Sequence, residues 1–306
     1  MPSMLERTAG SDGRLQIAFL GFGEAAQAFC SGWQDAAAPK VTAYDNATDD
    51  PARRDGKWAD YSRMGVAGAA DIAAALHGVS TIFSLVTADQ AQAAAMSAKS
   101  TIQPDALFLD CNSCAPQTKQ KNASIIKTAG GRYVDVAIMA PVHPRLHRTP
   151  ILISGDDAPS ALVVFQALGM SAEIVGDQVG AASSIKLCRS IMIKGLEALT
   201  VECVLVGREL GVEQKVLATL EDTFPDFGWT TRAAHMLERA IVHGRRRAAE
   251  MREAADMVEA IGLPGRMARS SAAWQQQIGE LELAAGAADL SGLADAALKA
   301  LGHTRL

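Results

Sequence analysis

A pair of glycines directly behind a short apolar run is the feature of this chain that points most directly to chemistry. The run LQIAFL ends in Gly21-Phe22-Gly23, and an alanine-rich helical pattern starts at once behind it. Gly21 permits a tight strand-to-helix turn, and Gly23 lets the backbone approach a pyrophosphate that rests on the unpaired N–H groups of the helix start. The third glycine position of the fingerprint also accepts a small alanine. We therefore predict a dinucleotide site made of Gly21, Phe22, Gly23, Glu24, Ala25 and Ala26.

An acidic residue at the end of the next apolar run supports this site. The run 40–44 ends in Asp45, about 20 residues beyond the glycines, where the ribose-binding acid of a dinucleotide site belongs. A carboxylate accepts hydrogen bonds from a 2′-hydroxyl and repels a 2′-phosphate, so Asp45 predicts NAD as the cofactor. Arg53 and Arg54 follow closely and keep NADP possible.

A lysine supplies the proton chemistry that nicotinamide reactions need. Lys186 lies near the start of a long helical pattern that follows the last predicted strand. Helical spacing places Ser190 on the same face, with Ser183 one turn earlier and Lys194 and Glu197 further along. Partial burial disfavours the charged form of a lysine, which moves its pKa toward the working range of a general acid/base. The alternative is an ordinary solvated helix face.

The first half of the chain must form the sheet that positions these residues. Apolar runs alternate with helical patterns there, which is typical of a parallel sheet with helical crossovers and a ligand crevice at the carboxyl ends of the strands. The predicted strands are 15–20, 40–44, 79–86, 106–110, 132–138, 151–154 and 172–175. The predicted helices are 24–37, 70–77, 88–99, 116–129 and 157–168.

The second half contains only helical patterns. They cover 180–209, 213–222, 230–261, 265–283 and 288–301. The sequence thus predicts an α/β chain, in which a Rossmann-type parallel-sheet domain, 1–179, precedes an all-α substrate and dimerisation domain, 180–306.

Composition limits the classes of function. The chain has 306 residues, of which 49% are hydrophobic, but no apolar span approaches the roughly 20 residues of a membrane helix. The net charge of −5 argues against a nucleic-acid partner. Five cysteines, an odd number, do not suggest a disulfide framework, and the first residues lack the apolar region of a secretory signal. We expect a cytoplasmic protein without a membrane partner.

Four ordered segments resemble the β-hydroxyacid dehydrogenases of the 6-phosphogluconate dehydrogenase superfamily, which include 3-hydroxyisobutyrate dehydrogenase. They are the glycine motif GFGEAA, the loop 110–116 (DCNSCAP), the segment 135–141 (DVAIMAP), and Gly180 with Lys186 and Ser190. The segment 243–251 is similar to the branch of this superfamily whose helical C-terminal domain has no known function.

The resemblance implies roles for particular residues. It makes Lys186 the catalytic lysine, with Ser190 assisting it, and places Asn112 and Ser113 in a loop that orients the substrate. It puts Val86 and Thr87, together with Asn112, beside the cofactor, although a helix cap explains Thr87 almost as well. It also implies a homodimer, because the family builds its second domain against a partner.

Two departures from the family pattern concern the substrate. Met139-Ala140-Pro141 replaces a Ser-Gly-Gly turn that holds the substrate carboxylate, and Pro141 has no N–H to offer. Arg189 and Ser190 replace two asparagines. The substrate contacts then fall to Met139, Ala140, Pro141, Arg189, Arg245 and Arg246.

The arginines near residue 245 have two interpretations. Arginine forks bind a carboxylate or phosphate well, so Arg245 and Arg246 can anchor an anionic substrate. Alternatively, they form an exposed helix face paired with Glu238, Glu250 and Glu253.

Other polar motifs carry less weight. Cys111 and Cys114 have CxxC spacing but lack the second pair of a zinc site. His143 and His147 lie in a proline-flanked loop without neighbouring carboxylates, so we predict no metal site.

These residues predict an NAD(P)-dependent dehydrogenase of CH–OH groups that acts on a small, anionic hydroxy or oxo acid. Three alternatives remain open. They are an imine or ketone reductase, a decarboxylating sugar-acid dehydrogenase, and a dinucleotide-binding sensor without catalysis.

Overall fold

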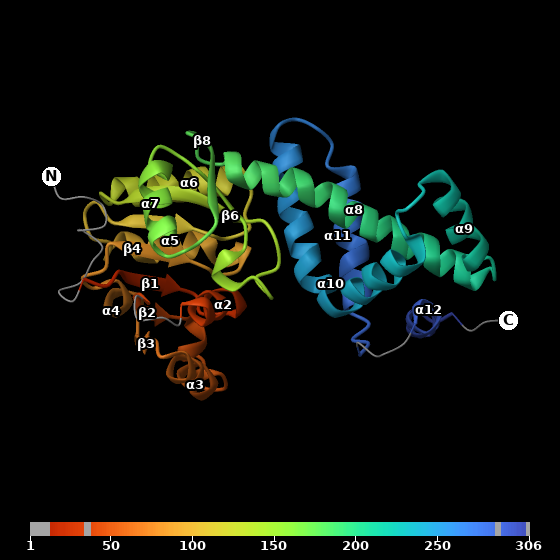
Figure 1. Ribbon diagram of the computed structural model, residues 1–306, viewed down its shortest axis with the longest axis horizontal. Helices are drawn as coiled ribbons and strands as arrows, with labels where there is room; N and C mark the ends of the chain where they lie inside the picture. The colour runs from red at the N-terminus through yellow and green to blue at the C-terminus, as the bar shows by residue number, and fades with distance from the viewer. Residues whose placement is uncertain (1–12, 34–37, 285–288, 304–306) are drawn as a thin grey trace. The chain divides into compact units, whose positions relative to one another are not determined.

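The computed structural model describes residues 13–33, 38–284 and 289–303. The chain forms two compact units, one ending at Lys186 and the other beginning at Leu187 (Figure 1). No helix among the described residues combines the length and the apolar character needed to cross a membrane.

The first unit contains an eight-stranded sheet with the order β3-β2-β1-β4-β5-β6-β7-β8. All neighbouring strands are parallel except β6 and β7, which are antiparallel. The strands are β1 (Gln16–Leu20), β2 (Lys40–Tyr44), β3 (Ala67–Gly68), β4 (Thr81–Ser84), β5 (Leu107–Asp110), β6 (Arg132–Ile138), β7 (Ile151–Ser154) and β8 (Ala172–Gly176).

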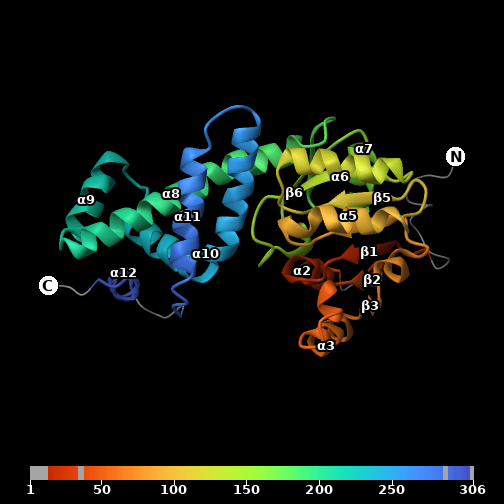
Figure 2. The same cartoon turned by 180° about the vertical axis from the view of Figure 1, so that it is seen from behind.

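Helices cover both faces of this sheet, and their alanine-rich inner sides allow close packing. One core joins β1, β5 and β6 to α2 (Glu24–Gly32) and α7 (Ala158–Ala167), and includes Tyr61 of α3 (Arg54–Met64). The other core packs α4 (Ile72–Leu76), α5 (Ala91–Lys99) and α6 (Pro116–Thr128) on the opposite face, where α5 and α6 lie in front of the sheet (Figure 2). Both faces of the central strands are therefore buried, as their nearly continuous apolar sequences require.

The second unit is helical throughout its described residues. It contains the greater part of α8 (Ala181–Glu209), which begins in the first unit. It also contains α9 (Glu213–Thr223), α10 (Trp229–Ala260), α11 (Arg266–Gly279) and α12 (Leu290–Ala300). Its core combines Val201 and Leu205 of α8 with Leu237 of α10, Ile278 of α11 and Ala294 of α12.

The predicted fold class is confirmed: a Rossmann-like sheet domain precedes a helical region. Residues 34–37 and 288, predicted as helix, lie outside the described residues. The sequence analysis missed α3 and β3. It also treated the sheet as wholly parallel, whereas β7 runs antiparallel to β6. The connection 139–150 contains only the 3₁₀ turn Leu146–Arg148, and without a crossover helix the chain reverses direction.

Candidate functional site

The glycine loop connects β1 to α2 and leaves the start of the helix open. Gly21 has φ +86°, and a Cβ there would collide with the carbonyl oxygen of Leu85. Its N–H donates to Tyr44 O at 2.8 Å, which ties the loop to β2. At Gly23 an added Cβ meets no atom within 4 Å, and this residue caps α2 without any side-chain hydrogen bond. The first turn of α2 can therefore receive an anion, and the loop fits a dinucleotide pyrophosphate.

The other residues of this motif divide between core and surface. Phe22 and Ala26 are fully buried, and the Phe22 ring lies 5.2 Å from that of Tyr61. Glu24 is exposed at the first position of α2, and Ala25 is half-buried. Phe22 and Ala26 thus contribute packing, while Gly23 and Glu24 form the accessible surface.

Asp45 lies directly behind the glycine loop. Its Oδ2 accepts the Phe22 N–H at 2.7 Å, and its Oδ1 accepts the Ala47 N–H at 2.9 Å. Lys57 Nζ lies 3.9 Å from Oδ2 and donates to Phe22 O at 2.8 Å. Asp45 therefore holds the glycine loop in place, and each carboxylate oxygen keeps accepting capacity for a ligand hydroxyl.

The loops after β4 and β5 are joined by Asn112. Its Oδ1 accepts the Val86 N–H at 2.7 Å, and its Nδ2 donates to Ser84 Oγ at 2.9 Å and to Asp110 Oδ1 at 2.7 Å. Both amide hydrogens are thus used within the protein. Thr87, the next residue of the β4 loop, is exposed.

Ser113 differs from its neighbour. Its Oγ is buried and has no hydrogen-bond partner among the described residues. A buried hydroxyl of this kind is costly unless something binds it, so Ser113 fits a role in ligand contact.

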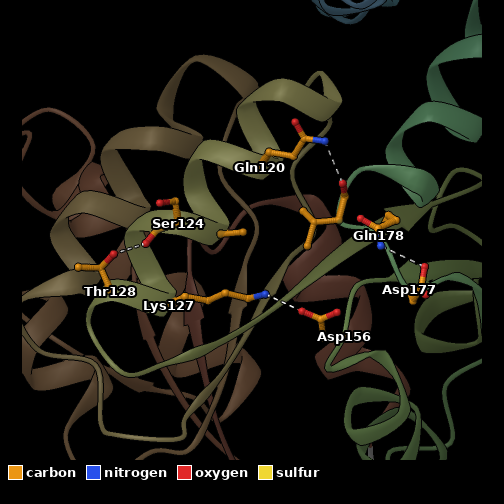
Figure 3. A pocket seen from close by; sticks show the side chains of 9 residues that line it. Gln120, Ser124, Lys127, Thr128, Asp156, Asp177 and Gln178 are labelled. Atoms are coloured by element: carbon orange, nitrogen blue, oxygen red, sulfur yellow. Dashed lines mark hydrogen bonds and ion pairs between the residues drawn. The ribbon is translucent and has the colours of Figure 1, made fainter.

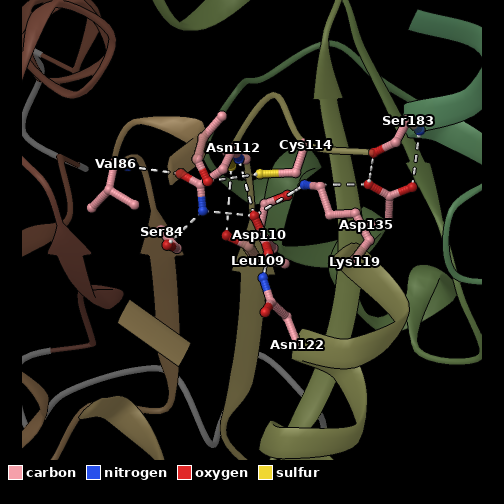
Figure 4. A network of polar contacts seen from close by, with 12 residues as sticks. Ser84, Val86, Leu109, Asp110, Asn112, Cys114, Lys119, Asn122, Asp135 and Ser183 are labelled. Carbon is pink, nitrogen blue, oxygen red and sulfur yellow. Dashed lines mark hydrogen bonds and ion pairs between the residues drawn. The ribbon is translucent and has the colours of Figure 1, made fainter. Parts of the chain in front are cut away.

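A buried ionic network continues from Asn112 toward α8 (Figure 4). Lys119 of α6 pairs with Asp110 Oδ1 at 3.0 Å and with Asp135 Oδ1 at 3.4 Å, and all three side chains are fully buried. Burial alone would lower the pKa of Lys119, but the two carboxylates outweigh it and the pKa is raised. Burial also raises the pKa of the Tyr133 hydroxyl, which donates to Asp110 Oδ2 at 2.6 Å.

Asp135 anchors the start of α8. Its Oδ2 accepts the N–H groups of Gly180 at 3.1 Å and Ser183 at 3.0 Å, and its Oδ1 accepts the Ser183 hydroxyl at 2.5 Å. A carboxylate at a helix start satisfies N–H groups that lack partners in the helix. Lys186 follows Ser183 by three residues and is partly buried.

The cysteines near Lys186 differ in exposure. Cys111 is buried, and Cys188 on α8 is exposed. Burial raises the pKa of the Cys111 thiol, while the charges of Lys119 and Lys186 act against this shift. The charge of Lys186 therefore acts on the loop that follows β5.

Further along α8, the polar residues Lys194 and Glu197 form ion pairs with α10. Lys194 Nζ donates to Ser190 Oγ at 3.1 Å and pairs with Glu250 Oε2 at 2.8 Å. Glu197 pairs with the buried Arg247. Desolvation lowers the pKa of Lys194, and Glu250 opposes that shift. These contacts bring Ser190 into an ionic cluster of the second unit.

The predicted substrate residues lie at the surface or close to it. Arg189 is exposed. Arg245 pairs with Glu282 at 2.7 Å and Arg246 with Glu250 at 3.2 Å, and both arginine side chains are more than half exposed. Met139, Ala140 and Pro141 follow β6, and the Met139 N–H donates to Pro150 O at 2.9 Å.

The sequence analysis gave no role to Lys119, Asp110 or Asp135. One signal could have identified the aspartates, because each interrupts an apolar run, LFLD and YVDVA. An acidic residue in a buried strand requires a partner. Lys119 lies in a polar helix segment and gave no such signal.

A polar surface pocket lies elsewhere in the first unit (Figure 3). Lys127 of α6 pairs there with Asp156 at 2.8 Å, and Gln120 donates to Val179 O at 3.3 Å. None of the predicted site residues lines it. Within the described ranges, no cluster of three or more histidine, cysteine or acidic side chains could hold a metal ion.

Comparisons with known proteins identify both parts of the chain. Residues 16–176 match the model of the NAD binding domain of 6-phosphogluconate dehydrogenase, and residues 208–278 match a domain of unknown function (DUF1932). An uncharacterized 28.5 kDa protein of Methanothermus fervidus is 31% identical over 117 residues. That match spans 38% of this chain and 44% of the relative, less than half of its length.

Two solved structures extend the likeness over nearly the whole chain. A conserved hypothetical protein from Sinorhizobium meliloti 1021 is 35% identical, with 93% of this chain and 96% of that chain covered and a TM-score of 0.75. A Mycobacterium tuberculosis 3-hydroxyisobutyrate dehydrogenase shares the fold at 15% identity, with 92% and 98% covered and a TM-score of 0.70. Since the first family model matches more than half of the residues, this chain belongs to the family that carries the NAD binding domain of 6-phosphogluconate dehydrogenase, in the branch with a C-terminal helical domain of unknown function.

Proposed function

We propose that this protein is an NAD(P)-dependent oxidoreductase that transfers hydride between nicotinamide and a small hydroxy or oxo acid, with Lys186 as its general acid/base. The strand register carries the proposal. Leu20, Ser84, Asp110 and Asp135 are paired in a row across β1, β4, β5 and β6. Gly21 follows the first of them, and the last anchors the start of α8. The glycine loop and the helix that bears Lys186 thus start at one level of the sheet.

The proposed site residues have different tasks. The bound nicotinamide supplies or accepts the hydride. Gly21, Gly23 and the start of α2 hold the pyrophosphate, and Asp45 accepts from the ribose. The Lys186 amine removes the hydroxyl proton during oxidation and returns it during reduction. Ser190 assists Lys186 from the next helix turn.

The two residues of the β5 loop have different tasks. Ser113 offers its hydroxyl to the substrate, because this group has no partner among the described residues. Asn112 instead positions the loops, because both its amide hydrogens are bonded to Ser84 and Asp110.

We propose that the substrate is anionic. Arg245 and Arg246 are proposed to bind it, in place of the Ser-Gly-Gly turn that the family resemblance implies. Arg245 and Arg246 pair with exposed or half-buried carboxylates. Such surface pairs contribute little free energy, so a substrate carboxylate can replace either partner. Arg189 and the segment 139–141 are the remaining candidate contacts.

We also propose a homodimer built on α8. Ile185, Met192, Leu199 and Val206 recur every seventh residue on this helix, and all four are exposed large apolar side chains. A seven-residue apolar repeat favours packing against another helix, and a contiguous exposed apolar stripe is typical of an interaction surface. The occupant that we propose is a second copy of this chain.

A reducing compartment fits the cysteines. All five are free thiols in the structure, and Cys30, Cys111 and Cys114 are buried. We propose a cytoplasmic location, where thiols stay reduced.

The test is nicotinamide turnover on matched panels of hydroxy acids, sugar acids and amines, each with NAD and with NADP. We expect oxidation of a small hydroxy acid. Preference for amines or neutral ketones would indicate an imine or ketone reductase. Release of carbon dioxide from a sugar acid would indicate a decarboxylating sugar-acid dehydrogenase. Tight cofactor binding without turnover of any substrate would leave the dinucleotide-binding sensor.

A further inference from the structure

The buried Lys119 connects three segments that the proposed function uses. Its ammonium lies between Asp110 at the end of β5 and Asp135 in β6, and also donates to Asp110 O at 2.5 Å. All three side chains have no exposed surface. Figure 4 shows the lysine reaching from α6 to the space between the two carboxylates.

One arm of this network reaches the loop that follows β4, where Val86 and Thr87 are proposed to lie beside the cofactor. Asp110 Oδ1 accepts from the Asn112 N–H at 3.0 Å and from its side-chain amide at 2.7 Å. The oxygen of that amide then accepts the Val86 N–H at 2.7 Å. Three hydrogen-bonded steps therefore connect Lys119 to the loop behind β4.

The other arm reaches the helix of the proposed general acid/base. Asp135 accepts the two N–H groups and the hydroxyl at the start of α8, from Gly180 and Ser183. Lys186 lies one helix turn beyond Ser183. A shift of Asp135 would thus move the first turn of α8 and the Lys186 side chain with it.

The charge of Lys119 is what allows both arms to meet. Two buried carboxylates at such short range repel each other, and each requires a cation or donors. Lys119 neutralises one negative charge and contacts both carboxylates. An apolar side chain of similar length would fill the space but would leave the carboxylates facing each other.

We propose that Lys119 is a positioning residue, which sets the place of Lys186 through Asp135 and Ser183 and the place of the Asn112 loop through Asp110. This inference rests on the proposed function. It makes no use of Lys119 as an acid or base, because the pKa of Lys119 is raised by its two partners.

The test compares Lys119→Met with Lys127→Met in the full-length protein. Lys127 lies on the same helix, half-exposed, and pairs with a surface carboxylate. We expect Lys119→Met to lower kcat about 100-fold, the effect of a misplacement of about 1 Å, and to weaken NAD binding by a clearly smaller factor through the Asn112 loop. Lys127→Met should leave both unchanged. Equal loss of kcat and cofactor binding in Lys119→Met would contradict a positioning role.

The pH profile gives a second readout. The titratable or charged groups that act on Lys119 are Asp110, Asp135, Cys111 and Cys114, while Tyr133 acts on the two carboxylates and Lys186 acts on Cys111. Without the lysine, a proton taken up between the carboxylates restores one hydrogen bond. The ratio of variant to wild-type kcat should therefore rise as the pH falls from 9 to 6. Lys119→Met/Asp110→Asn, which removes both charges, should regain part of the activity. A flat ratio and no rescue would overturn the proposal.

A readout without turnover separates this inference from the proposed function. Reductive ¹³C-methylation makes each accessible lysine visible by NMR, and Lys186→Arg assigns the Lys186 signal. We expect the Lys186 signal to titrate at a different pH in Lys119→Met than in the wild type. Ser183→Ala, a milder change in the same chain of contacts, should have the same effect and serves as the test if Lys119→Met does not fold. An unchanged Lys186 signal in both variants would refute the positioning role. A shifted signal in a protein without any turnover would refute only the proposed function.

Discussion

At the scale of single residues, Asp45 already has a structural role in the absence of a ligand. Its two oxygens already accept the N–H groups of Phe22 and Ala47. The carboxylate therefore cannot turn away to admit a 2′-phosphate without releasing the glycine loop. Arg53 and Arg54 are also engaged, with Asp50 and with Thr48 O. From the two hydrogen bonds of Asp45, we propose that the protein prefers NAD over NADP.

We expect NAD to bind at least tenfold more tightly than NADP, which corresponds to about 1.4 kcal/mol. Calorimetric titration of the wild-type protein with each cofactor measures the ratio of the two dissociation constants. Asp45→Asn keeps one oxygen acceptor for the loop and removes the charge, so it should reduce the difference in affinity between NAD and NADP. NADP bound tenfold more tightly by the wild type would show that the role given to Asp45 is wrong.

Lys186 carries the sharpest catalytic prediction. Lys186→Met keeps the apolar stem and removes the amine, so the fold and cofactor binding should persist. Turnover should fall by about 10²–10⁴, the usual contribution of general acid/base catalysis. Steady-state kinetics on the true substrate, with thermal denaturation as the fold control, would measure it. A variant within a few-fold of wild type would mean that the proton moves by another route.

The sequence indicated the motif residues but not their partners. Gly21, Gly23, Asp45 and Lys186 could be singled out because residue type and spacing carry the chemistry. The contacts of Lys119 with Asp110 and Asp135 could not, because they join residues from three elements through side-chain packing. The pairing of Lys194 with Glu250 depends in the same way on the packing of α8 against α10.

At the scale of elements, the β1 to α2 connection contains two glycines with opposite requirements. Gly21 needs its positive φ and the absence of a Cβ, because the carbonyl of Leu85 is in contact there. Gly23 has ordinary φ and open space around it. One glycine serves the fold, and the other leaves room for a ligand.

Alanine substitutions should separate these two tasks. Gly21→Ala should lower the free energy of unfolding by about 1–3 kcal/mol, because it introduces backbone strain. Gly23→Ala should leave unfolding nearly unchanged and weaken cofactor binding, because its methyl group enters the space proposed for the pyrophosphate. Chemical denaturation and cofactor titration of both variants check this. Equal stability losses would contradict the distinction.

Elements differed in how well the sequence predicted them. The strands β1, β2 and β6 contain mainly apolar or β-branched residues and were predicted within one residue. α3 was missed because its sequence RDGKWADYSRM has no apolar stripe, and Tyr61 is its single buried residue. Its position depends on packing against Phe22, which only the folded unit provides.

At the scale of the whole molecule, the apolar repeat on α8 predicts assembly. Met192 is 71% exposed and Leu199 55%, values that are unfavourable on a helix facing water. The second unit already has its own core, built from other faces of its helices. The exposed stripe is therefore available to another chain.

We expect a dimer in solution, and Met192→Glu/Leu199→Glu should convert it to a monomer, because the charges would be buried in the interface. Analytical ultracentrifugation of both proteins measures this. Met96→Glu, at a 52% exposed position on α5, is the matched control and should remain dimeric. A wild-type protein that sediments as a monomer at all concentrations would refute the interface.

The distribution of the thiols gives the protein a ready-made position for a spectroscopic probe. Cys188 is exposed two residues beyond Lys186, whereas burial raises the pKa of Cys30 to about 12 and also raises that of Cys111. Cys188 lies between Ile185 and Met192 on the helix face proposed for the dimer, so a maleimide should modify it well before the buried thiols in the monomer but slowly in the dimer. The rate of labelling at this position would therefore report the assembly of two chains without any knowledge of the substrate.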